Sequence, residues 1–321
     1  MKKLKIQKIE FPYFPSVEKP PVLIPGNFDG VHRGHRILIE EGRRISKILK
    51  TNLVVLFFEP HPYLFFHKNR NNFLLTTLEE KIEILKSLKV NEVWILNFDE
   101  KLAETSPEIF ADKLLNLEIS RLILGPDHTF GKDKKGNIFT MVEIAREKGK
   151  VLTIFPFITY KNRKISSTRI RELIEKGEIE EANTLLGYNF FINGTKIKGS
   201  GRGKKLGFPT INLKISELKI KPKEGVYIVE TEIKNKTYQG LLYYGSRPTF
   251  NEKEKVFEVY LFNFNGEFKN KNLKVKFHKF IRNDMKFDSV EELKKQIEKD
   301  INIGYTYFLK KGSNPNEKNL E

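Results

Sequence analysis

Hydrophobic residues in the first half of the chain fall into short runs separated by segments of helical periodicity. Runs without polar alternation are typical of strands buried in a parallel sheet, and they lie at 22–25, 53–58, 92–96, 121–124 and 151–155. Apolar residues near helical spacing predict helices at 35–50, 78–88, 107–117, 141–148 and 169–176. This alternation predicts an α/β fold with a doubly wound parallel sheet, in which ligands bind at the carboxyl ends of the strands.

The pattern changes after residues 186–188, where short alternating runs broken by turns begin. Two pairs of runs predict hairpins, 226–233 with 238–244, and 257–264 with 273–280 around Asn265-Gly266. A helix is expected at 289–300, because Ser289 and Glu292 have the spacing of a capping box. We therefore predict two domains, residues 1–186 and residues 187–321, the second being a small antiparallel β-barrel with a C-terminal helix.

Composition narrows the class of protein. The chain has 321 residues, more than one typical core, and 39% of them are hydrophobic, which excludes a disordered chain. Cysteine is absent, which excludes disulfides, thiolate nucleophiles and cysteine-based metal sites. No apolar run approaches the ~20 residues of a membrane span and no signal-peptide core follows the N-terminus, so we expect a cytoplasmic protein without a membrane partner.

The charge balance points to an anionic ligand. The 58 basic and 41 acidic residues give a net charge of +17. Such an excess favours nucleic acid or a phosphate-rich ligand as partner. A lysine-rich surface without a specific partner is the alternative.

The segment 26–35 follows a predicted strand and opens a predicted helix. Such a junction offers backbone N–H groups and the positive end of the helix dipole to a phosphate. His32 and His35 lie on one face of the first turn, where two imidazoles can donate to phosphate oxygens and stabilise charge that develops on an α-phosphate. Gly34 between them allows a nucleotide to approach the backbone. The alternative is two histidines that complete a local turn.

The segment 165–171 is a second candidate phosphate site, because it also opens a helix. Its hydroxyls can cap helix N–H groups or bind phosphate, and Arg171 can hold phosphate oxygens bidentately. A plain N-cap followed by a surface arginine is the alternative. Two anion sites at two helix starts of one sheet would hold a triphosphate along its length, and phosphate transfer there needs positioning more than a nucleophilic residue.

Four segments of the first half together resemble bacterial FAD synthetase, the bifunctional riboflavin kinase/FMN adenylyltransferase: 26–35, 58–62, 125–131 and 165–171. The histidine signature alone fits any nucleotidyltransferase of the superfamily, whereas the four segments in this order are more specific. The resemblance implies adenylyl transfer from ATP to FMN, giving FAD and pyrophosphate. It assigns six residues to ATP and its phosphates, namely Asn27, His32, His35, Ser167, Thr168 and Arg171. It places Asp127 and Phe130 beside the flavin or the adenine.

The densest cluster of glycine and lysine in the chain lies at 198–212. It matches neither a Walker loop nor the dinucleotide-binding glycine pattern. A flexible basic loop with Gly199, Gly203 and Lys204 can still surround phosphates with its N–H groups, and a mobile surface loop is the alternative. Thr210 and Asn212 are two apart on a predicted strand, so their side chains face the same way and their oxygens can bind Mg²⁺.

This region resembles the riboflavin kinase half of the same family, in the segments 206–213, 224–227, 245–250 and 258–260. The resemblance implies phosphoryl transfer from ATP to the 5′-hydroxyl of riboflavin. Thr210 and Asn212 match the ligands of Mg-ATP, Glu258 matches the base that takes the hydroxyl proton, and Arg247 matches a flavin contact. A solvent-facing glutamate is the alternative for Glu258.

The barrel half departs from the family pattern at three points. Tyr243 replaces a common asparagine, residues 268–270 replace a Leu-Tyr-Gly element, and Asp284 takes the place of the glutamate in Arg-x-Glu-x-x-Phe. The leading interpretation is a bifunctional enzyme that phosphorylates riboflavin and adenylylates FMN, both with Mg-ATP. The alternative that these departures motivate is FMN adenylyltransferase alone, with a weakened or inactive kinase domain.

A nucleic-acid-binding protein is a hypothesis of a different class, and it predicts steeply salt-dependent binding without magnesium. We expect no nucleic-acid partner, because no common DNA- or RNA-binding signature is present and the basic loops coincide with the candidate ATP sites. The expected partners are riboflavin, FMN and ATP. The oligomeric state, including weak self-association, stays open.

Overall fold

The computed structural model describes residues 4–246, 255–266 and 268–312. The chain divides into two compact units, Met1–Ser167 and Thr168–Glu321. The first unit is built on a parallel sheet and the second on an antiparallel barrel. The expected domain boundary between residues 186 and 187 stays a prediction.

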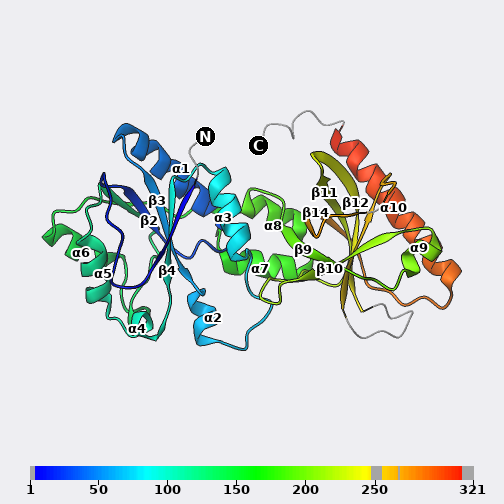
Figure 1. The fold of residues 1–321 in the computed structure, drawn as a ribbon, viewed down its shortest axis with the longest axis horizontal. Helices are drawn as coiled ribbons and strands as arrows, with labels where there is room; N and C mark the ends of the chain where they lie inside the picture. Colours follow the sequence, from blue (N-terminus) through cyan, green and yellow to red (C-terminus); the bar gives the residue numbers. More distant parts are fainter. Residues whose placement is uncertain (1–3, 247–254, 267, 313–321) are drawn as a thin grey trace. The chain divides into compact units, whose positions relative to one another are not determined.

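The first unit contains a six-stranded parallel sheet with the order β1-β4-β3-β2-β5-β6 (Figure 1). Its strands are β1 Lys5–Ile9, β2 Val22–Pro25, β3 Leu53–Glu59, β4 Glu92–Asn97, β5 Arg121–Leu124 and β6 Leu152–Ile154. The doubly wound sheet is confirmed. Only β1 had no predicted counterpart, because this edge strand is largely exposed and its sequence KIQKI lacks an apolar run.

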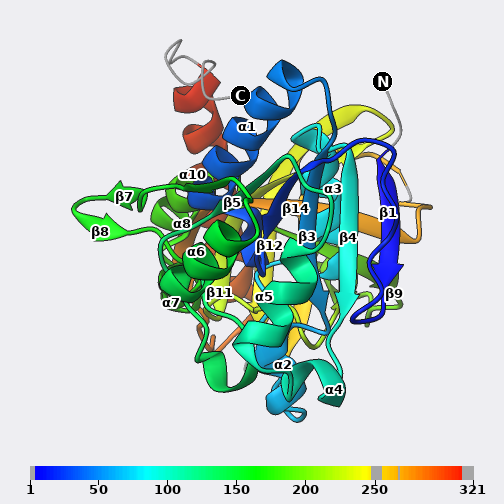
Figure 2. The same ribbon diagram turned by 90° about the vertical axis from the view of Figure 1, so that its left-hand side faces the viewer.

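Helices cover both faces of this sheet. They are α1 Arg33–Ile48, α2 Pro62–Phe66, α3 Leu78–Ser87, α4 Glu100–Ala103, α5 Pro107–Leu115 and α6 Ile138–Glu147, with the 3₁₀ turns η1 Asp29–Val31 and η2 Lys132–Lys134. Helix α1 packs so closely on one face that a Cβ at Gly42 would lie 2.7 Å from Ile24 Cδ1. Side chains such as Phe110 of α5 and Met141 of α6 build the core against strand residues such as Leu56. Figure 2 shows the small hairpin of β7 Thr159–Tyr160 and β8 Arg163–Lys164 projecting from this unit.

The topology of the sheet places two loops side by side. Strand β2 lies between β3 and β5, and the chain visits β3 and β4 on one side of β2 before it returns to the other side as β5. The loops that follow β2 and β5 therefore leave the same edge of the sheet as neighbours, which is where open parallel sheets bind ligands. Residues 26–35 follow β2 and residues 125–131 follow β5, so the fold brings these two distant segments to one edge.

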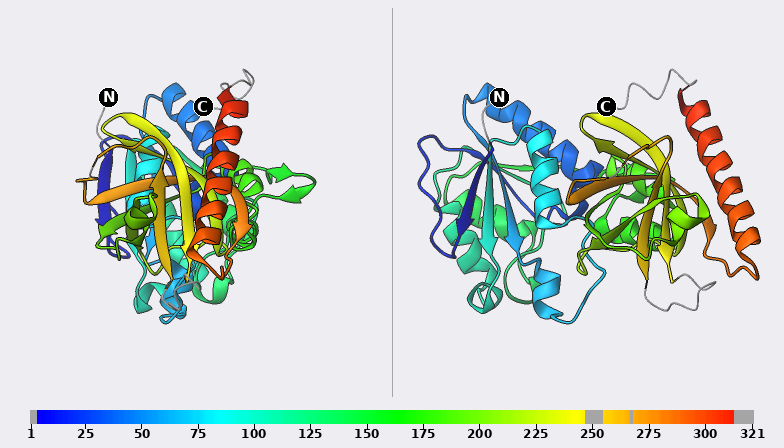
Figure 3. Two further views of the ribbon diagram at one scale, coloured as in Figure 1. Left: turned by 90° about the vertical axis from the view of Figure 1, so that its right-hand side faces the viewer. Right: turned by 45° about the vertical axis from the view of Figure 1, so that its right-hand side comes forward.

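The second unit contains a closed six-stranded barrel with the order β10-β13-β12-β11-β14-β9 (Figure 3). The strands are β9 Phe191–Ile197, β10 Thr210–Ile215, β11 Gly225–Ile233, β12 Lys236–Gly245, β13 Val256–Leu261 and β14 Asn272–Asn283. The helices are α7 Ser167–Lys176, which starts at the last residue of the first unit, α8 Ile179–Leu186, α9 Arg202–Leu206 and α10 Val290–Gly312. The predicted antiparallel barrel with a C-terminal helix is confirmed.

One of the two predicted hairpins is present. Strands β11 and β12 pair around a two-residue turn, in which Lys234 and Asn235 have φ angles of 51° and 62°. The second hairpin prediction is wrong, because β13 pairs with β10 and β12, whereas β14 pairs with β11 and β9. Barrel closure gives both strands other neighbours, so the local turn signal at Asn265-Gly266 does not decide the pairing.

Helix α10 is longer than predicted, since it continues from Val290 to Gly312. Its apolar side chains, including Phe308, pack on Leu241 and Phe262 of the barrel. Gly304 interrupts the apolar pattern in sequence, yet it lies at the closest contact, because a Cβ there would be 2.8 Å from Phe262 Cζ. The absence of a side chain at Gly304 thus allows the helix to approach the barrel.

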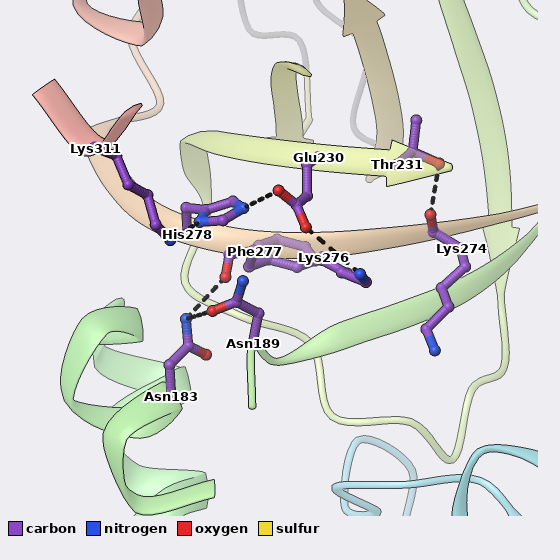
Figure 4. A network of polar contacts seen from close by, with 9 residues as sticks. All are labelled: Asn183, Asn189, Glu230, Thr231, Lys274, Lys276, Phe277, His278 and Lys311. Carbon is purple, nitrogen blue, oxygen red and sulfur yellow. Dashed lines mark hydrogen bonds and ion pairs between the residues drawn. The ribbon is translucent and has the colours of Figure 1, made fainter. Parts of the chain in front are cut away.

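A partly buried polar network around His278 ties strands of the barrel together (Figure 4). His278 Nε2 of β14 lies 3.0 Å from a carboxylate oxygen of Glu230 on β11, and Lys276 Nζ lies 3.5 Å from the other oxygen. Asn183 of α8 donates a 2.8 Å hydrogen bond to the carbonyl of Phe277. The hydrogen bond from His278 and the charge of Lys276 lower the pKa of Glu230 to about 2.

This network predicts acid sensitivity of the barrel. A carboxyl whose pKa is lowered on folding stabilises the native state above its unfolded pKa, and this stabilisation is lost as pH falls from about 4.5 towards 2. We expect Glu230→Gln to lower the free energy of unfolding at pH 7. The unaltered protein should lose about 1 kcal/mol more of this free energy between pH 7 and pH 3.5 than the variant does. Urea denaturation at both pH values, with hydrogen exchange of β11 and β14 peptides as the local readout, measures this difference. An unchanged pH dependence in the variant would contradict the assignment.

Candidate active sites

A strained turn connects β2 to α1 in the first unit. Phe28 and Val31 have φ angles of 50° and 36°, a left-handed conformation that is strained for the β-branched valine. Buried Asp29 holds the turn, because its carboxylate accepts 3.1 Å hydrogen bonds from the backbone N–H groups of Leu75 and Thr76. The N-terminus of α1 follows directly, so the turn fixes how the first residues of this helix are presented.

The two predicted histidines lie together at this helix start. His32 is the N-cap of α1 and His35 lies on its first turn, with ring centroids 3.8 Å apart and ring planes 15° from parallel. Gly34 allows this arrangement, since a Cβ there would lie only 3.2 Å from the His32 ring. Both Nδ1 atoms are buried and have no hydrogen-bond partner among the described residues. They are polar atoms at a helix N-terminus that a ligand can satisfy.

The protonation of the histidine pair suits an anion. Burial lowers the pKa of His32 to about 4 and that of His35 well below the usual 6.5. Both rings are therefore neutral at pH 7, which allows them to stack without charge repulsion. Each neutral imidazole still carries one N–H donor, and the helix dipole favours negative charge at this end. A bound phosphate would raise both pKa values, because a nearby negative charge favours the protonated ring.

Two further segments approach the same place. Asp127, in the loop after β5, forms an ion pair with Lys164 of β8, and both charges influence the pKa of His32, where Lys164 lowers it and Asp127 raises it. Ser167 Oγ donates a 2.9 Å hydrogen bond to the carbonyl of Asp29. The structure therefore brings three segments that the sequence singled out into one site at the edge of the sheet.

A buried lysine that the sequence analysis missed supports this site. Lys81 of α3 donates from Nζ to the carbonyl of Asn27 at 2.9 Å and lies 4.3 Å from the ring centroid of Phe57. Burial lowers the pKa of Lys81, and the negative charges of Asp29 and Glu59 offset this shift only in part. The side chain of Asn27 itself is exposed. A lysine on an amphipathic helix usually faces solvent, so no local pattern marks Lys81 as part of the site.

Three more residues were predicted for the first site. Phe130 is 5% exposed and packs in the core against Phe110, with ring centroids 5.7 Å apart, which gives it a structural part in the fold. Thr168 and Arg171 lie on the first turns of α7, at the start of the second unit. Arg169 between them is buried in an ion pair with a glutamate of α8. The assignment of Thr168 and Arg171 to ATP stays a prediction.

The predicted kinase residues lie together on one face of the barrel. Thr210 Oγ1 donates to Glu258 Oε1 at 3.4 Å, and Asn212 lies directly opposite Glu258 in the pairing of β10 with β13. Asn212 is only 8% exposed. Directly opposed residues on neighbouring strands share a face, so these three side chains can act on one ligand.

The glycine-rich segment packs directly on this face. A Cβ at Gly199 would lie 2.3 Å from Asn212 Nδ2, and one at Gly203 would lie 3.1 Å from Thr210 Oγ1. A side chain at Gly199 would therefore collide with Asn212, and one at Gly203 would collide with the carbonyl of Phe208, 2.5 Å away, and crowd Thr210. The glycines let the backbone lie against them.

Part of the glycine-rich segment is ordered, so the expectation of a flexible loop is wrong over Arg202–Leu206. These residues form the short helix α9, bounded by Gly201 and Gly207 with φ angles of 74° and 92°. Left-handed glycines start and end the helix, which explains why the composition looks like that of a loop. Lys204 is exposed on this helix.

A pocket opens beside Glu258 in the second unit. Much of its lining is apolar, with Leu206, Phe208, Leu241, Tyr260, Phe287 and Ile297. Thr210, Glu258, Tyr243 and Asp284 add polar groups to the same lining. An apolar pocket with a few convergent polar groups is typical of a site for a small aromatic molecule. The predicted flavin contact Arg247 lies outside the described residues.

Comparison with known proteins identifies the family. A family model described as FAD synthetase matches residues 15–169, and one described as riboflavin kinase matches residues 186–308. The bifunctional riboflavin kinase/FMN adenylyltransferase of Bacillus subtilis is 36% identical over 292 residues, which cover 89% of this chain and 92% of that protein. The chain belongs to the bifunctional riboflavin kinase/FMN adenylyltransferase family.

Two further similar proteins also match over most of this chain. The Escherichia coli K12 protein of the same name is 34% identical over 296 residues, covering 89% of this chain and 92% of its own. A solved structure described as a macrolide-efflux protein from Streptococcus pneumoniae has a TM-score of 0.84 and 29% identity, covering 94% of this chain and 99% of that one. Within the described ranges of the present chain, none of the helices has the length and apolar character to cross a membrane.

The barrel face of this family member also fits magnesium bound to a nucleotide. Within residues 4–246, 255–266 and 268–312, no cluster of three His, Asp or Glu side chains could hold a metal alone. Thr210 and Asn212 offer a hydroxyl and an amide oxygen, and Mg²⁺ commonly completes its coordination with substrate phosphates and water. The donor set therefore suits Mg-ATP better than a resident ion.

The neutral histidine pair predicts proton uptake when the first site binds phosphate. At pH 6.0, His32 with a pKa of about 4 is unprotonated in the free protein, and a triphosphate should raise this pKa. We expect uptake of up to about one proton per bound nucleotide. Calorimetric titration with a non-hydrolysable ATP analogue in two buffers of different ionisation enthalpy measures it. Equal uptake by a His32→Ala/His35→Ala variant would contradict this origin.

The close contact at Gly34 predicts a selective defect. Gly34→Ala places a methyl group 3.2 Å from the His32 ring, so the stacked pair must shift. We expect FAD formation from FMN to fall about tenfold or more, because small displacements of positioning groups are costly. FMN formation from riboflavin by the same preparation is the internal control and should stay within twofold. Equal loss of both activities would indicate general misfolding and count against a local role.

Proposed function

We propose that the chain carries out two consecutive ATP-dependent reactions, phosphorylation of riboflavin to FMN on the barrel and adenylylation of FMN to FAD on the parallel-sheet unit. The observation that carries this proposal is the presence of both family matches in order, each over a unit with its own candidate site. The cytoplasm, where riboflavin and ATP meet, is the proposed location.

In the proposed adenylyl transfer, a phosphate oxygen of FMN attacks the α-phosphorus of ATP. A new oxygen–phosphorus bond forms, the bond between the α-phosphorus and the bridging oxygen breaks, and pyrophosphate leaves with the electron pair. The N–H donors of His32 and His35 and the start of α1 would stabilise the charge on the α-phosphate. Ser167, Thr168 and Arg171 are proposed to hold the β- and γ-phosphates. No covalent enzyme intermediate is needed.

In the proposed kinase reaction, the 5′-hydroxyl of riboflavin attacks the γ-phosphorus of ATP and ADP leaves. Glu258 would accept the hydroxyl proton, because a carboxylate on a barrel strand is held rigidly beside the pocket. Thr210 and Asn212 would hold Mg²⁺ on the phosphates, and the ion supplies charge neutralisation of the transferring group. The N–H groups near Gly199 and Gly203 are proposed to contact the nucleotide phosphates.

The alternative of an inactive kinase half has little support. The departures at Tyr243 and Asp284 leave Thr210, Asn212 and Glu258 together on one face of the barrel. Phe268, in the segment that replaces a family element, is buried at 4% exposure, and its carbonyl accepts a 2.6 Å hydrogen bond from Lys196. Phe268 is thus packed into the barrel, whereas Lys269 and Asn270 are exposed.

A product assay with two variants tests both reactions. The protein is incubated with ATP and Mg²⁺ and either riboflavin or FMN, and the flavins are separated by chromatography. We expect FMN and then FAD from riboflavin, and FAD from FMN. Glu258→Gln should slow only FMN formation, by about 10²-fold or more, and His32→Ala should slow only FAD formation, by about 10²-fold.

The other outcomes of this assay are equally informative. FAD from FMN without any product from riboflavin would leave adenylylation and reject the kinase. No flavin product from either substrate would reject the proposal. Chelation of Mg²⁺ by EDTA should stop both reactions, and phosphorylation of riboflavin that survives EDTA would reject the metal assignment at Thr210 and Asn212.

A further inference from the structure

One row of residues crosses the barrel at a single level. Asn212 on β10 is opposite Glu258 on β13, which is opposite Tyr243 on β12. The row continues from Tyr243 to Val226 on β11 and from there to Arg282 on β14. Directly opposed side chains on neighbouring strands share a face and lie close together. Tyr243 is therefore the neighbour of the proposed base on the side away from the magnesium ligands.

Tyr243 is joined to the segment that leads into α10. Its hydroxyl donates a 3.0 Å hydrogen bond to Asp284 Oδ2, and the other oxygen, Oδ1, accepts from the backbone N–H of Met285 at 2.9 Å. A Cβ at Gly245 would lie 2.6 Å from the tyrosine hydroxyl and 2.8 Å from Asp284 Oδ2. The pair is thus confined from several sides, and it has little freedom to rearrange.

A second contact, made by Arg282 two residues before Asp284, joins the same segment to α10. Arg282 Nε donates to both carboxylate oxygens of Asp300 on α10, at 3.1 and 3.0 Å, and Asp300 is only 2% exposed. The guanidinium of Arg282 also lies 5.8 Å from the ring centroid of Phe287. Met285 and Phe287, which follow Asp284 in the chain, line the same pocket as Glu258, and we call these two apolar side chains the wall.

We infer that Tyr243 and Asp284 act as one positioning pair, which sets the distance between this apolar wall and Glu258 and so determines how well the flavin acceptor fits. The inference rests on the proposed kinase function of the barrel. We expect the pair to contribute little to ATP binding, because Asn212, matched to Mg-ATP, lies on the other side of Glu258 from Tyr243 in this row. Tyr243 and Asp284 also belong to the lining themselves, and in the inferred role they hold the wall in place and do not move a proton.

The test is a double-variant cycle on the complete chain. Tyr243→Phe removes the hydroxyl and keeps the ring, Asp284→Ala removes its acceptor, and the third protein carries both changes. We expect each single variant to raise the KM for riboflavin about tenfold, the effect of one lost hydrogen bond to a charged group. The KM for ATP and kcat should change less than twofold, and the double variant should be no worse than Asp284→Ala alone.

Two controls separate this effect from damage to the fold. Tyr238→Phe alters another tyrosine of β12, whose ring packs on Phe264 at 5.2 Å, and should leave all kinase constants unchanged. FAD formation from FMN reports on the first unit in every variant. Multiplicative effects of the two single changes, an equal rise in the KM for ATP, or a fall in kcat without a change in the KM for riboflavin would each overturn the pairing.

Direct binding distinguishes failure of this inference from failure of the kinase proposal. Riboflavin fluorescence quenching gives a Kd without turnover. If the unaltered protein formed no FMN, the kinase function would fail, and quenching would still test whether the pair sets flavin affinity. Weaker riboflavin binding in Tyr243→Phe, with equal loss in the double variant, supports the inference, whereas an unchanged Kd in all three variants rejects it.

Discussion

Both candidate sites depend on a glycine whose backbone lies against a side chain matched to ATP or to Mg-ATP. In the first unit Gly34 leaves room for the His32 ring to stack on the start of α1, and in the second Gly199 leaves room for Asn212. A Cβ at either glycine would occupy space next to this side chain and force the side chain to shift. In the first unit the turn before α1 is strained, and Asp29 stabilises it by accepting two backbone hydrogen bonds.

The two folds solve the same assembly problem by different means. A parallel sheet gathers segments through topology, because strands that reverse their order around β2 deliver the loops after β2 and β5 to one edge. A closed antiparallel barrel gathers residues through register, because each strand places every second side chain on a given face. Strand order decides the first site, whereas a one-residue slip would dismantle the second by sending Glu258 to the other face.

This difference explains what the sequence could predict. Strand ends and glycine-flanked histidines are local features, so residues 26–35 and the doubly wound sheet were predictable. Pairing of β13 with β10 and β12 is not local, and the turn signal at Asn265-Gly266 suggested the wrong partner. Lys81 and the contact between Tyr243 and Asp284 also depend on segments far apart in sequence. Phe130 was named within a loop motif, but hydrophobic burial determined its actual place in the core.

The net charge of +17 is weak evidence for a nucleic-acid partner. Several cations near the described sites are held by carboxylates or are buried, as in the pairs of Lys164 with Asp127 and Arg282 with Asp300, and at Lys81, whereas Lys204 is exposed. A paired cation projects a weaker field into solution than a free one, so it contributes less to non-specific attraction of nucleic acid. Meanwhile the histidines at the centre of the first site are neutral at pH 7. The proposed recognition of phosphate there would therefore rest on oriented N–H donors and a helix terminus more than on net charge.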